Sequence, residues 1–595
     1  MSDHSFSANE KGEISTTENV DNDLRRVRTE DEDYKFTFGK FLATLAFQQG
    51  YMADVFVIIM SSTILQDINR SIGPNPNYTW VAITPTLGAA VVSPLVGRMS
   101  DIFGRRNFLL AGNVLGFIGC AIAATADNIN TVIGGSVLIG VGSGLHQTAW
   151  ACLAEVVPKN YRSVASGIFE STLALAQAFG PVIGTVMVKY ASWRAAYWLP
   201  FAMNFFAGSL VFFFYHPVNQ YIREEGKTVW QQALALDWIG TFLLISGLVL
   251  FLLGITFGGS QFPWVSAGTL APLCIGFVLL VILGFYEAYA DITYPIFPPA
   301  IFKLVRGFTV VLISVFLVGM IYYATAVLWA EQVGALYTTD PLKIGWYASA
   351  TGFGGMTFGP ICGYVFKNVG HARILVTIAV GTMGLCCGLQ AIVTPGSHIA
   401  STILVYLIGG FLSSANVFQV TIVQLTVSHE YIGVATALIT TARSVGGSVA
   451  TAIYTSILKN KLIAFIPKYL ALPLALAGVA PASLPAVIGA LTTGTGLEAL
   501  ATLTPAQLGI GIYGVKESFA HAFRVVYLVT IAFGVLGTLA VCFTANVDHL
   551  MTRKVDIKLE EGAHLHGAVD TGEGHVIHHG EKGNETCTAS TDVFE

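Results

Sequence analysis

The sequence predicts an all-α protein that crosses a membrane many times, and two observations lead to this fold class. Fourteen apolar runs lie between about Phe41 and Ala545, each close to the roughly 20 residues that a bilayer core requires. Hydrophobic residues make up 54% of the 595 residues and charged residues only 11%, whereas a soluble domain is about 25% charged. Because lipid cannot satisfy backbone hydrogen bonds, each apolar run is predicted to be a helix.

The predicted spans form two groups of six with an extra pair between them. They are placed at 41–65, 80–98, 108–126, 131–156, 163–188, 195–215, 236–258, 268–290, 308–330, 344–366, 373–393, 399–426, 432–457 and 523–545. Five prolines interrupt the apolar pieces of 458–522, so this stretch is predicted to be a long outer loop with short helices at the membrane interface.

The domain boundaries follow from this grouping. The two polar tails lack the apolar residues of a core and are predicted to be disordered. The regions are a tail 1–40, an N-terminal six-helix half 41–215, a linker 216–307 with two extra helices, a C-terminal six-helix half 308–545, and a tail 546–595.

Loop charge predicts the orientation, because cytoplasmic loops carry an excess of Lys and Arg. The loops 258–268 and 394–398 carry no charged residue. The alternate loops hold Arg98, Arg105, Arg106, Lys159, Arg162, Arg223, Lys227, Lys303, Arg306, Lys367 and Arg373. Both tails are therefore predicted to be cytoplasmic, and the sequon at Asn77, in the first outer loop, is a candidate glycosylation site.

An internal repeat indicates a transporter. The loop Gly97-Arg-Met-Ser-Asp101-Ile-Phe-Gly104-Arg105-Arg106 has a later counterpart in Gly363-Tyr-Val-Phe-Lys367-Asn-Val-Gly370-His371-Ala-Arg373, with the same spacing between its glycines. Tyr161 and Tyr431 each precede a further pair of matching helices. Repeated halves are typical of secondary transporters, whose substrate site lies between the repeats.

These residues resemble a known superfamily. The loop from Gly97 to Arg106 is similar to the signature loop of the major facilitator superfamily, and Ala178-Phe-Gly180-Pro181-Val-Ile-Gly184 resembles the motif of its proton-driven antiporters. Asp54 and the stretch Leu236-Asp237-Trp238-Ile239-Gly240 look like features of its fourteen-span drug:proton antiporters. The order of these pieces most resembles the fungal trichothecene efflux pump family, with fungal siderophore transporters as close relatives. The resemblance implies a major facilitator fold.

One position departs from the antiporter pattern, which has an arginine in span 4, four residues before a glycine. Alignment on Gly144 places Gly140 there. The proton must therefore be handled by other groups.

Two groups of residues are candidates for conformational change. Asp101, Arg105 and Arg106, with Gly97 and Gly104, form a candidate gating loop. In one state Asp101 pairs with Arg105 or with a neighbouring helix end; simple anchoring by positive charge is the alternative. Gly180, Pro181 and Gly184 form a candidate hinge, or a candidate seal against the other half. The alternative is that these residues reflect the ordinary tolerance of Gly and Pro in membrane helices.

Four ionisable residues near mid-membrane are candidates for proton coupling. Asp54 leads, because a lone carboxylate in a span costs several kcal/mol unless it is paired, protonated or beside water. Glu170 and His146 are the further candidates, and Arg443 is a possible counter-charge from the opposite half or a contact for the substrate. Each has a structural alternative as a hydrogen-bonding residue of the bundle.

A candidate substrate cavity is predicted from polar and aromatic residues in the spans, although aromatic residues also serve as membrane packing. These residues are Gln177, Tyr322, Tyr323, Asn416 and Gln419.

No nucleotide-binding Gly-x-x-x-x-Gly-Lys-Ser/Thr loop is present, so transport is expected to draw on an ion gradient. The predicted function is proton-coupled efflux of a small amphipathic toxin or drug, such as a mycotoxin. Proton-coupled uptake of a ferric siderophore is the alternative, and a transporter-like sensor is a third. The chain is predicted to be no enzyme and to use no cofactor or metal. Its expected partners are a small molecule, protons and lipid, without nucleic acid. It is expected to be a monomer in the plasma membrane, or in a vacuolar or vesicle membrane.

Overall fold

A computed structural model describes residues 38–551, except 76, 217–228, 260, 291, 293, 393 and 494–496. All described residues belong to one compact unit. The predicted tails, apart from a few residues at their inner edges, lie outside the described residues. Within the described residues the structure is helical, apart from two isolated bridges.

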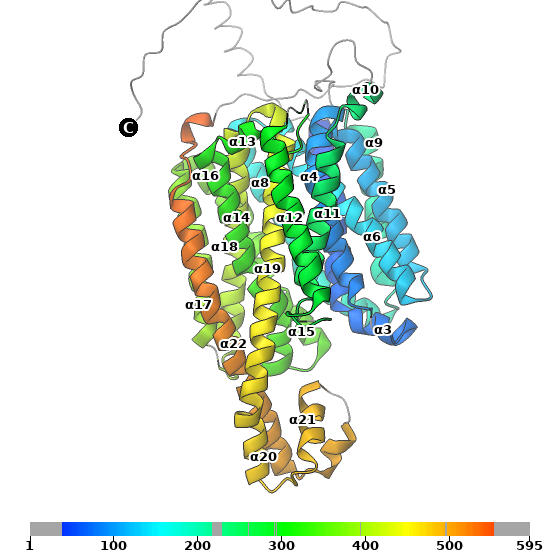
Figure 1. Cartoon of the computed structure of the whole chain (residues 1–595), viewed down its shortest axis with the longest axis vertical. Helices are drawn as coiled ribbons and strands as arrows, with labels where there is room; N and C mark the ends of the chain where they lie inside the picture. Colours follow the sequence, from blue (N-terminus) through cyan, green and yellow to red (C-terminus); the bar gives the residue numbers. More distant parts are fainter. Residues whose placement is uncertain are drawn as a thin grey trace, which may run out of the picture. The chain divides into compact units, whose positions relative to one another are not determined.

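Long helices stand at each predicted span of the N-terminal half, here called the N-half (Figure 1). The fourth span is broken at Gln147 into two helices, and a short helix α3 (Leu65–Ile72) follows the first span. The long helices are α2 (Phe38–Thr63), α4 (Trp80–Phe103), α5 (Arg105–Ala124), α6 (Ile129–His146) with α7 (Thr148–Val156), α8 (Arg162–Tyr190) and α9 (Ala195–Phe214).

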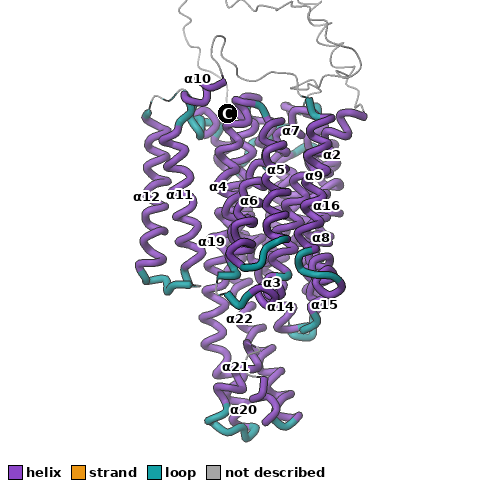
Figure 2. Tube along the Cα trace, turned by 90° about the vertical axis from the view of Figure 1, so that its right-hand side faces the viewer, coloured by secondary structure: helices purple, strands orange, loops and turns teal. Residues whose placement is uncertain are grey.

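The linker and the C-terminal half, here called the C-half, follow the same pattern. After the short α10 (Val229–Leu234), the linker holds α11 (Trp238–Phe257) and α12 (Ala267–Tyr289), which lie at one side of the bundle (Figure 2). The C-half contains α14 (Val310–Leu336), α15 (Pro341–Ala348), α16 (Ala350–Val369), α17 (Ala372–Leu389), α18 (His398–Thr426), α19 (Ile432–Ile466) and α22 (Pro505–Cys542).

Thirteen helices of the described part are long and apolar enough to cross a membrane. The predicted tenth span coincides with α16, which is not among them. Its 20 residues include five glycines, which lower its hydropathy but let it pack closely between α8 and α18. The count of fourteen spans, with both tails in the cytoplasm, therefore stays a prediction.

The two halves meet at two places. At one of them α8 of the N-half packs against α16 and α18 of the C-half, and at the other α4 packs against α19. The extra helix α11 contacts α4 and α19 from outside this second pair. The halves therefore enclose a central region bounded by helices of both.

The segment 458–522, predicted as a loop with short helices, is largely helical. In Figures 1 and 2 it extends beyond the ends of the other helices, with α19 running through Ile466 and α22 starting at Pro505. Its prolines did not break these helices, because Pro467, Pro473 and Pro505 occupy first-turn positions that need no N–H donor. A small core forms between the α19 and α22 extensions, α20 (Leu472–Leu476) and α21 (Leu484–Thr493). Its buried members are Leu470, Leu474, Val479 and Val487.

Candidate transport site

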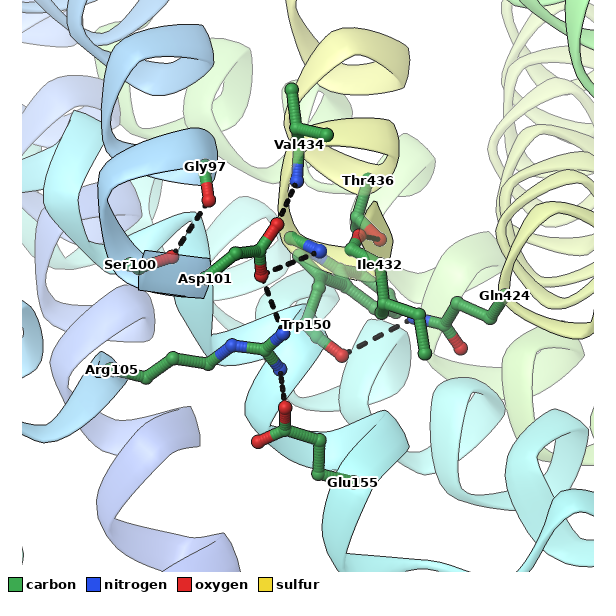
Figure 3. A network of polar contacts seen from close by, with 11 residues as sticks. Gly97, Ser100, Asp101, Arg105, Trp150, Glu155, Gln424, Ile432, Val434 and Thr436 are labelled. Atoms are coloured by element: carbon green, nitrogen blue, oxygen red, sulfur yellow. Dashed lines mark hydrogen bonds and ion pairs between the residues drawn. The ribbon is translucent and has the colours of Figure 1, made fainter. Parts of the chain in front are cut away.

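The predicted gating loop joins the two halves at the end of the bundle that carries the basic loops (Figure 3). Asp101, at the end of α4, accepts hydrogen bonds from the backbone N–H groups of Gly433 and Val434, at distances of 3.1 and 3.0 Å. Arg105 pairs with Asp101 at 2.8 Å and with Glu155 at 2.6 Å. All three ionised side chains are buried. The carboxylate thus lies at the N-terminus of α19, where the helix dipole favours negative charge.

The prediction offered Arg105 and a helix end as alternative partners of Asp101, whereas the structure shows both at once. Arg106 takes no part in this network. Its guanidinium instead donates to the backbone oxygen of Phe212 in α9, at 2.8 Å. Gly104, with φ of +90°, forms the turn between α4 and α5 in a conformation that favours glycine.

Close backbone contact at this end is repeated in the two halves. Gly97 of α4 lies against the start of α19, where a Cβ at Gly97 would be 2.7 Å from the Ala437 Cβ and 3.0 Å from the Val434 Cα. Gly363 of α16 lies against the start of α8, where a Cβ would be 3.1 Å from the Val164 Cα. Each half therefore docks a glycine on the other, as the internal repeat predicts.

The charges at these two contacts are not equivalent. The Arg98 guanidinium lies 5.3 Å from the centre of the Tyr431 ring, and the Lys367 ammonium lies 3.5 Å from the centre of the Tyr161 ring, which matches the repeat. However, Lys367 occupies the position of Asp101 in the second loop. Only the contact between α4 and α19 thus has a carboxylate at the helix N-terminus.

Further polar contacts close the halves at the same end. Arg162 of α8 donates to the backbone oxygen of Gln424 in α18 at 2.8 Å, and the Gln424 side chain donates to the backbone oxygen of Trp150 at 3.2 Å. Arg162, Gln424 and Trp150 are all buried. The structure therefore represents a state that is closed at the end carrying the basic loops.

Asp54 forms a buried dyad with His146, the two being only 0% and 1% exposed. Their Oδ2 and Nδ1 atoms lie 2.6 Å apart. Asn113 of α5 and Asn204 of α9 are also buried nearby, and each uses its amide nitrogen on a backbone oxygen of its own helix. A Cβ at Gly50 would lie 2.9 Å from both the Asn113 Oδ1 and the His146 Nε2, so this pocket is packed to its limit. The dyad and its surroundings belong entirely to the N-half.

Glu170 lies instead where the halves meet. Its Oε1 accepts a hydrogen bond of 2.8 Å from Asn416 of α18, and Glu170 interacts electrostatically with Arg443 of α19. The Arg443 Nε and Nη2 are buried without a hydrogen-bond partner among the described residues. Of the two carboxylates, Glu170 is therefore the one that interacts with Arg443, whereas Asp54 pairs with His146.

The predicted cavity residues divide into two sets. Gln177 of α8 and Tyr322 of α14 meet across the halves at 3.4 Å. Asn416, as above, also crosses, and the Tyr323 ring covers Gly447 of α19 within the C-half. Gln419 donates to Ser314 at 2.9 Å and is fully buried within the C-half. The structure thus brings Gln177, Tyr322 and Asn416 to the contact between the halves, but places Gln419 in the interior of one half.

The candidate hinge contacts both halves: a Cβ at Gly345 of α15, in the C-half, would lie 3.5 Å from the Pro181 O. A Cβ at Gly180 would lie 2.9 Å from the Ile59 Cγ2, and one at Gly184 would lie 3.5 Å from the Met60 Cα, both on α2 of the same half. Helix α8 also approaches the other half closely at Gly167, which lies against Gly359, and at Ala178, where a Cβ at Gly352 would lie 2.5 Å from the Ala178 Cα. A hinge within the N-half and a seal against the C-half therefore both stay predictions.

The missing arginine of span 4 has a steric explanation. A Cβ at Gly140 would lie 2.8 Å from both the Cα and the O of Pro85 in α4, so α6 and α4 pack there by backbone contact. Asn77 lies in an exposed turn before α4, as a glycosylation site requires.

Sequence reasoning missed four polar residues around these sites: Glu155, Tyr51, Asn113 and Asn204. Two of them had a signal in the sequence. Tyr51 precedes Asp54 by three residues and so shares its face of the helix, and Asn113 stands alone in an apolar span. Glu155 had none, because its pairing with Arg105 depends on how α7 packs.

The fold and this arrangement define a secondary transporter of the major facilitator type, with two repeated halves and polar groups between them. Solved structures agree on the fold. The human organic anion transporter MFSD10 (TETRAN) is 12% identical, with a TM-score of 0.54 over 85% of this chain and 100% of that one. The proton:xylose symporter XylE is 14% identical, with a TM-score of 0.53 over 86% and 98%.

The chain belongs to the fungal trichothecene efflux pump (TRI12) family, whose model matches residues 24–580. It is 26% identical to the trichothecene efflux pump TRI12 of Fusarium sporotrichioides over 530 residues, which cover 88% of each chain. It is 28% identical to the pump of the same name from Trichoderma arundinaceum, over 85% of this chain and 86% of that one. An MFS-type transporter, prx5 of Penicillium rubens, is 26% identical over 87% and 93%. The prediction of the family is confirmed, and the chain is a transporter and no enzyme.

Proposed function

We propose that this protein exports a small amphipathic secondary metabolite of the trichothecene type across the fungal plasma membrane, in exchange for protons. The names of two of its relatives, both trichothecene efflux pumps, support efflux. The observation that supports proton coupling is the presence of two buried acids, Asp54 beside His146 and Glu170 beside Asn416. A carboxyl group buried at membrane depth must be either paired or protonated.

The two acids lie in different parts of the structure, so their protonation has different effects in the transport cycle. Asp54 lies inside the N-half, so its protonation changes the packing of α2 against α6. Glu170 contacts Asn416 across the halves, so its protonation changes a contact that must rearrange when the halves rock. One proton moving down about 100 mV releases about 2.3 kcal/mol, which sustains roughly fifty-fold accumulation of an uncharged substrate.

The test is transport into inverted membrane vesicles with an acidic interior, using a radiolabelled trichothecene and a ferric siderophore in parallel. We expect accumulation of the trichothecene, with Asp54→Asn abolishing pH-driven accumulation but preserving exchange of substrate across the membrane. Glu170→Gln should lose accumulation in part. Asp127→Asn is the matched control, since this side chain is 94% exposed.

Each outcome has a defined meaning. If right-side-out vesicles accumulated the ferric siderophore and inverted vesicles did not accumulate the trichothecene, the proposal of export would be replaced by one of uptake. If Asp54→Asn accumulated substrate at the normal rate, Asp54 would be structural, and Glu170 or His146 would be the group that couples protons to transport.

A further inference from the structure

The extra helix pair of the linker has an ordered polar end that the proposed function does not use. Asp237 caps α11, where its Oδ1 accepts the Gly240 N–H at 2.8 Å and the Tyr286 hydroxyl of α12 at 3.2 Å. Leu236 forms an isolated bridge with Tyr294, which follows α12. The stretch from Leu236 to Gly240 therefore joins the two extra helices and the chain that leaves them.

A second buried carboxylate fixes this outgoing chain. The Oε1 of Glu287, in α12, accepts the backbone N–H groups of Ile296 and Phe297 at 2.9 and 3.3 Å. Ile296 is buried in an apolar cluster against which Leu95 of α4 also packs. The segment 294–297 is thus held between the linker and the N-half.

Pro295, inside this segment, contacts the gating loop. Its backbone oxygen accepts a hydrogen bond of 3.1 Å from the Nε of Arg98, a buried residue of α4. The Arg98 guanidinium lies 5.3 Å from the centre of the Tyr431 ring, and Tyr431 comes two residues before Gly433, whose N–H donates to Asp101. Arg98 therefore contacts the linker and the start of α19 at the same time.

We propose that Arg98 helps to close the contact between α4 and α19, and that the linker positions it there. The inference goes beyond the proposed function, because it applies to any substrate. Glu287 is a positioning residue, which acts through the Pro295 carbonyl that fixes the Arg98 guanidinium over the Tyr431 ring. When the halves separate, the contact with Tyr431 breaks, whereas Pro295 stays with α4 because its segment packs on Leu95.

The second contact between the halves shows why Arg98 needs a positioning group. There the Lys367 ammonium lies 3.5 Å from the centre of the Tyr161 ring. An ammonium is a compact point charge, whereas a guanidinium is planar and must be turned to face a ring. The linker helix α11 packs beside the first contact, against α4 and α19. The extra helix pair is therefore placed to stabilise the contact whose cation has a plane to orient.

The test is hydrogen exchange of the full-length protein in detergent micelles, without substrate or proton gradient. One peptide covers Ile296 and Phe297, the donors to Glu287, and the other spans 428–436, which includes the donors to Asp101. In Glu287→Leu we expect faster exchange in both peptides, by about tenfold at 428–436. In Tyr431→Leu only 428–436 should be faster, by the same factor. Tenfold corresponds to the loss of one desolvated cation–π contact.

Two further variants distinguish positioning from general damage to the fold. Glu287→Gln keeps an acceptor oxygen for both amides, so exchange in both peptides should stay within about twofold of the wild type. The double variant Glu287→Leu/Tyr431→Leu should exchange at 428–436 about as fast as either single variant, because the second substitution removes a contact that is already lost. Independent effects would instead multiply to about a hundredfold.

The control is Glu498→Leu, at an exposed position in the segment 458–522, which should leave both peptides unchanged. Faster exchange confined to Ile296 and Phe297 in Glu287→Leu would overturn the proposal, as would wild-type exchange at 428–436 in Tyr431→Leu. A hundredfold effect in the double variant, or a loss in Glu287→Gln equal to that in Glu287→Leu, would also overturn it. Failure of the proposed function is distinguishable, because it would appear in the vesicle assay and leave these exchange rates unchanged.

Discussion

Replacement of Asp101 by asparagine should open the contact between α4 and α19. Asp101 is bound on one side by Arg105, which belongs to the same half and keeps Glu155 as a partner. On the other side it accepts two backbone N–H groups at the start of α19. Only the second set of contacts must break when the halves separate. The substitution therefore weakens the closed state relative to the open one.

The magnitude follows from those two hydrogen bonds and the helix dipole. Hydrogen bonds to a charged acceptor contribute about 1.5–3 kcal/mol and neutral ones about 0.5–1.5 kcal/mol. A carboxylate at a helix N-terminus adds about 0.3–1 kcal/mol, and up to ~2 kcal/mol when partly buried. Asparagine keeps an acceptor oxygen but loses the charge, so we expect a loss of about 2–4 kcal/mol of closure. At about 1.4 kcal/mol per tenfold change, this corresponds to a shift of about 30- to 700-fold toward the open state.

Hydrogen exchange measures this shift directly, because the Gly433 and Val434 amides are the donors to Asp101. Mass spectrometry of the peptide that spans 428–436 should show faster exchange in Asp101→Asn by about the same factor, at constant pH and with intact fold. Asp127→Asn, a change at an exposed carboxylate, should leave this peptide unaltered. Unchanged exchange of these amides in Asp101→Asn would refute the assignment of Asp101 as the group that holds the halves closed.

Three further substitutions test other parts of the structure. Gly140→Arg, which introduces the arginine of the antiporter pattern, should reduce the folded yield on size-exclusion chromatography, because the first side-chain carbon already meets Pro85; a stable, active variant would show that α4 and α6 can separate there. Gly184→Val should slow flux while the protein stays folded, since its Cβ would lie 3.3 Å from the Cγ2 of Ile64, in the turn between α2 and α3; full flux would reduce the motif to packing. Val265→Cys, at an 88% exposed position between α11 and α12, should react with an impermeant maleimide from outside the cell; labelling only after permeabilisation would reverse the topology.

The helices were predictable because membrane spans depend on composition and length alone. Every predicted span coincides with a helix, including α16, whose glycines make it less apolar than the others. Helix ends outside the predicted spans were less predictable. Pro505 was taken as an interruption, whereas it starts α22 behind a capping box formed by Thr504 and Gln507. A proline stabilises the start of a helix but breaks its interior. Hydrophobic periodicity does not show which of these positions a proline occupies.

The candidate site was predictable in its residue types but not in its pairings. Asp54, His146, Glu170 and Arg443 are each visible as polar residues in apolar spans. Which of them meet depends on the rotation of each helix about its axis, and this is set by glycine contacts such as that of Gly140 with Pro85. Sequence reasoning therefore left the partner of each group open, whereas packing within the N-half pairs Asp54 with His146.

The repeat distinguishes the residues that close the halves from the residues proposed to couple them to protons. Glycine docking is present twice, at Gly97 and at Gly363, as expected for steric closure about a pseudo-twofold axis. The ionisable groups break this symmetry: the carboxylate of Asp101 is matched by Lys367, and the dyad of Asp54 and His146 lies in the N-half. Duplicated glycines can make both helix contacts tight, but the proposed coupling requires that protonation favours one conformation over the other. Asp101 lies at only one of the two contacts and the dyad lies within one half, so protonation of either carboxylate would act on the two halves unequally.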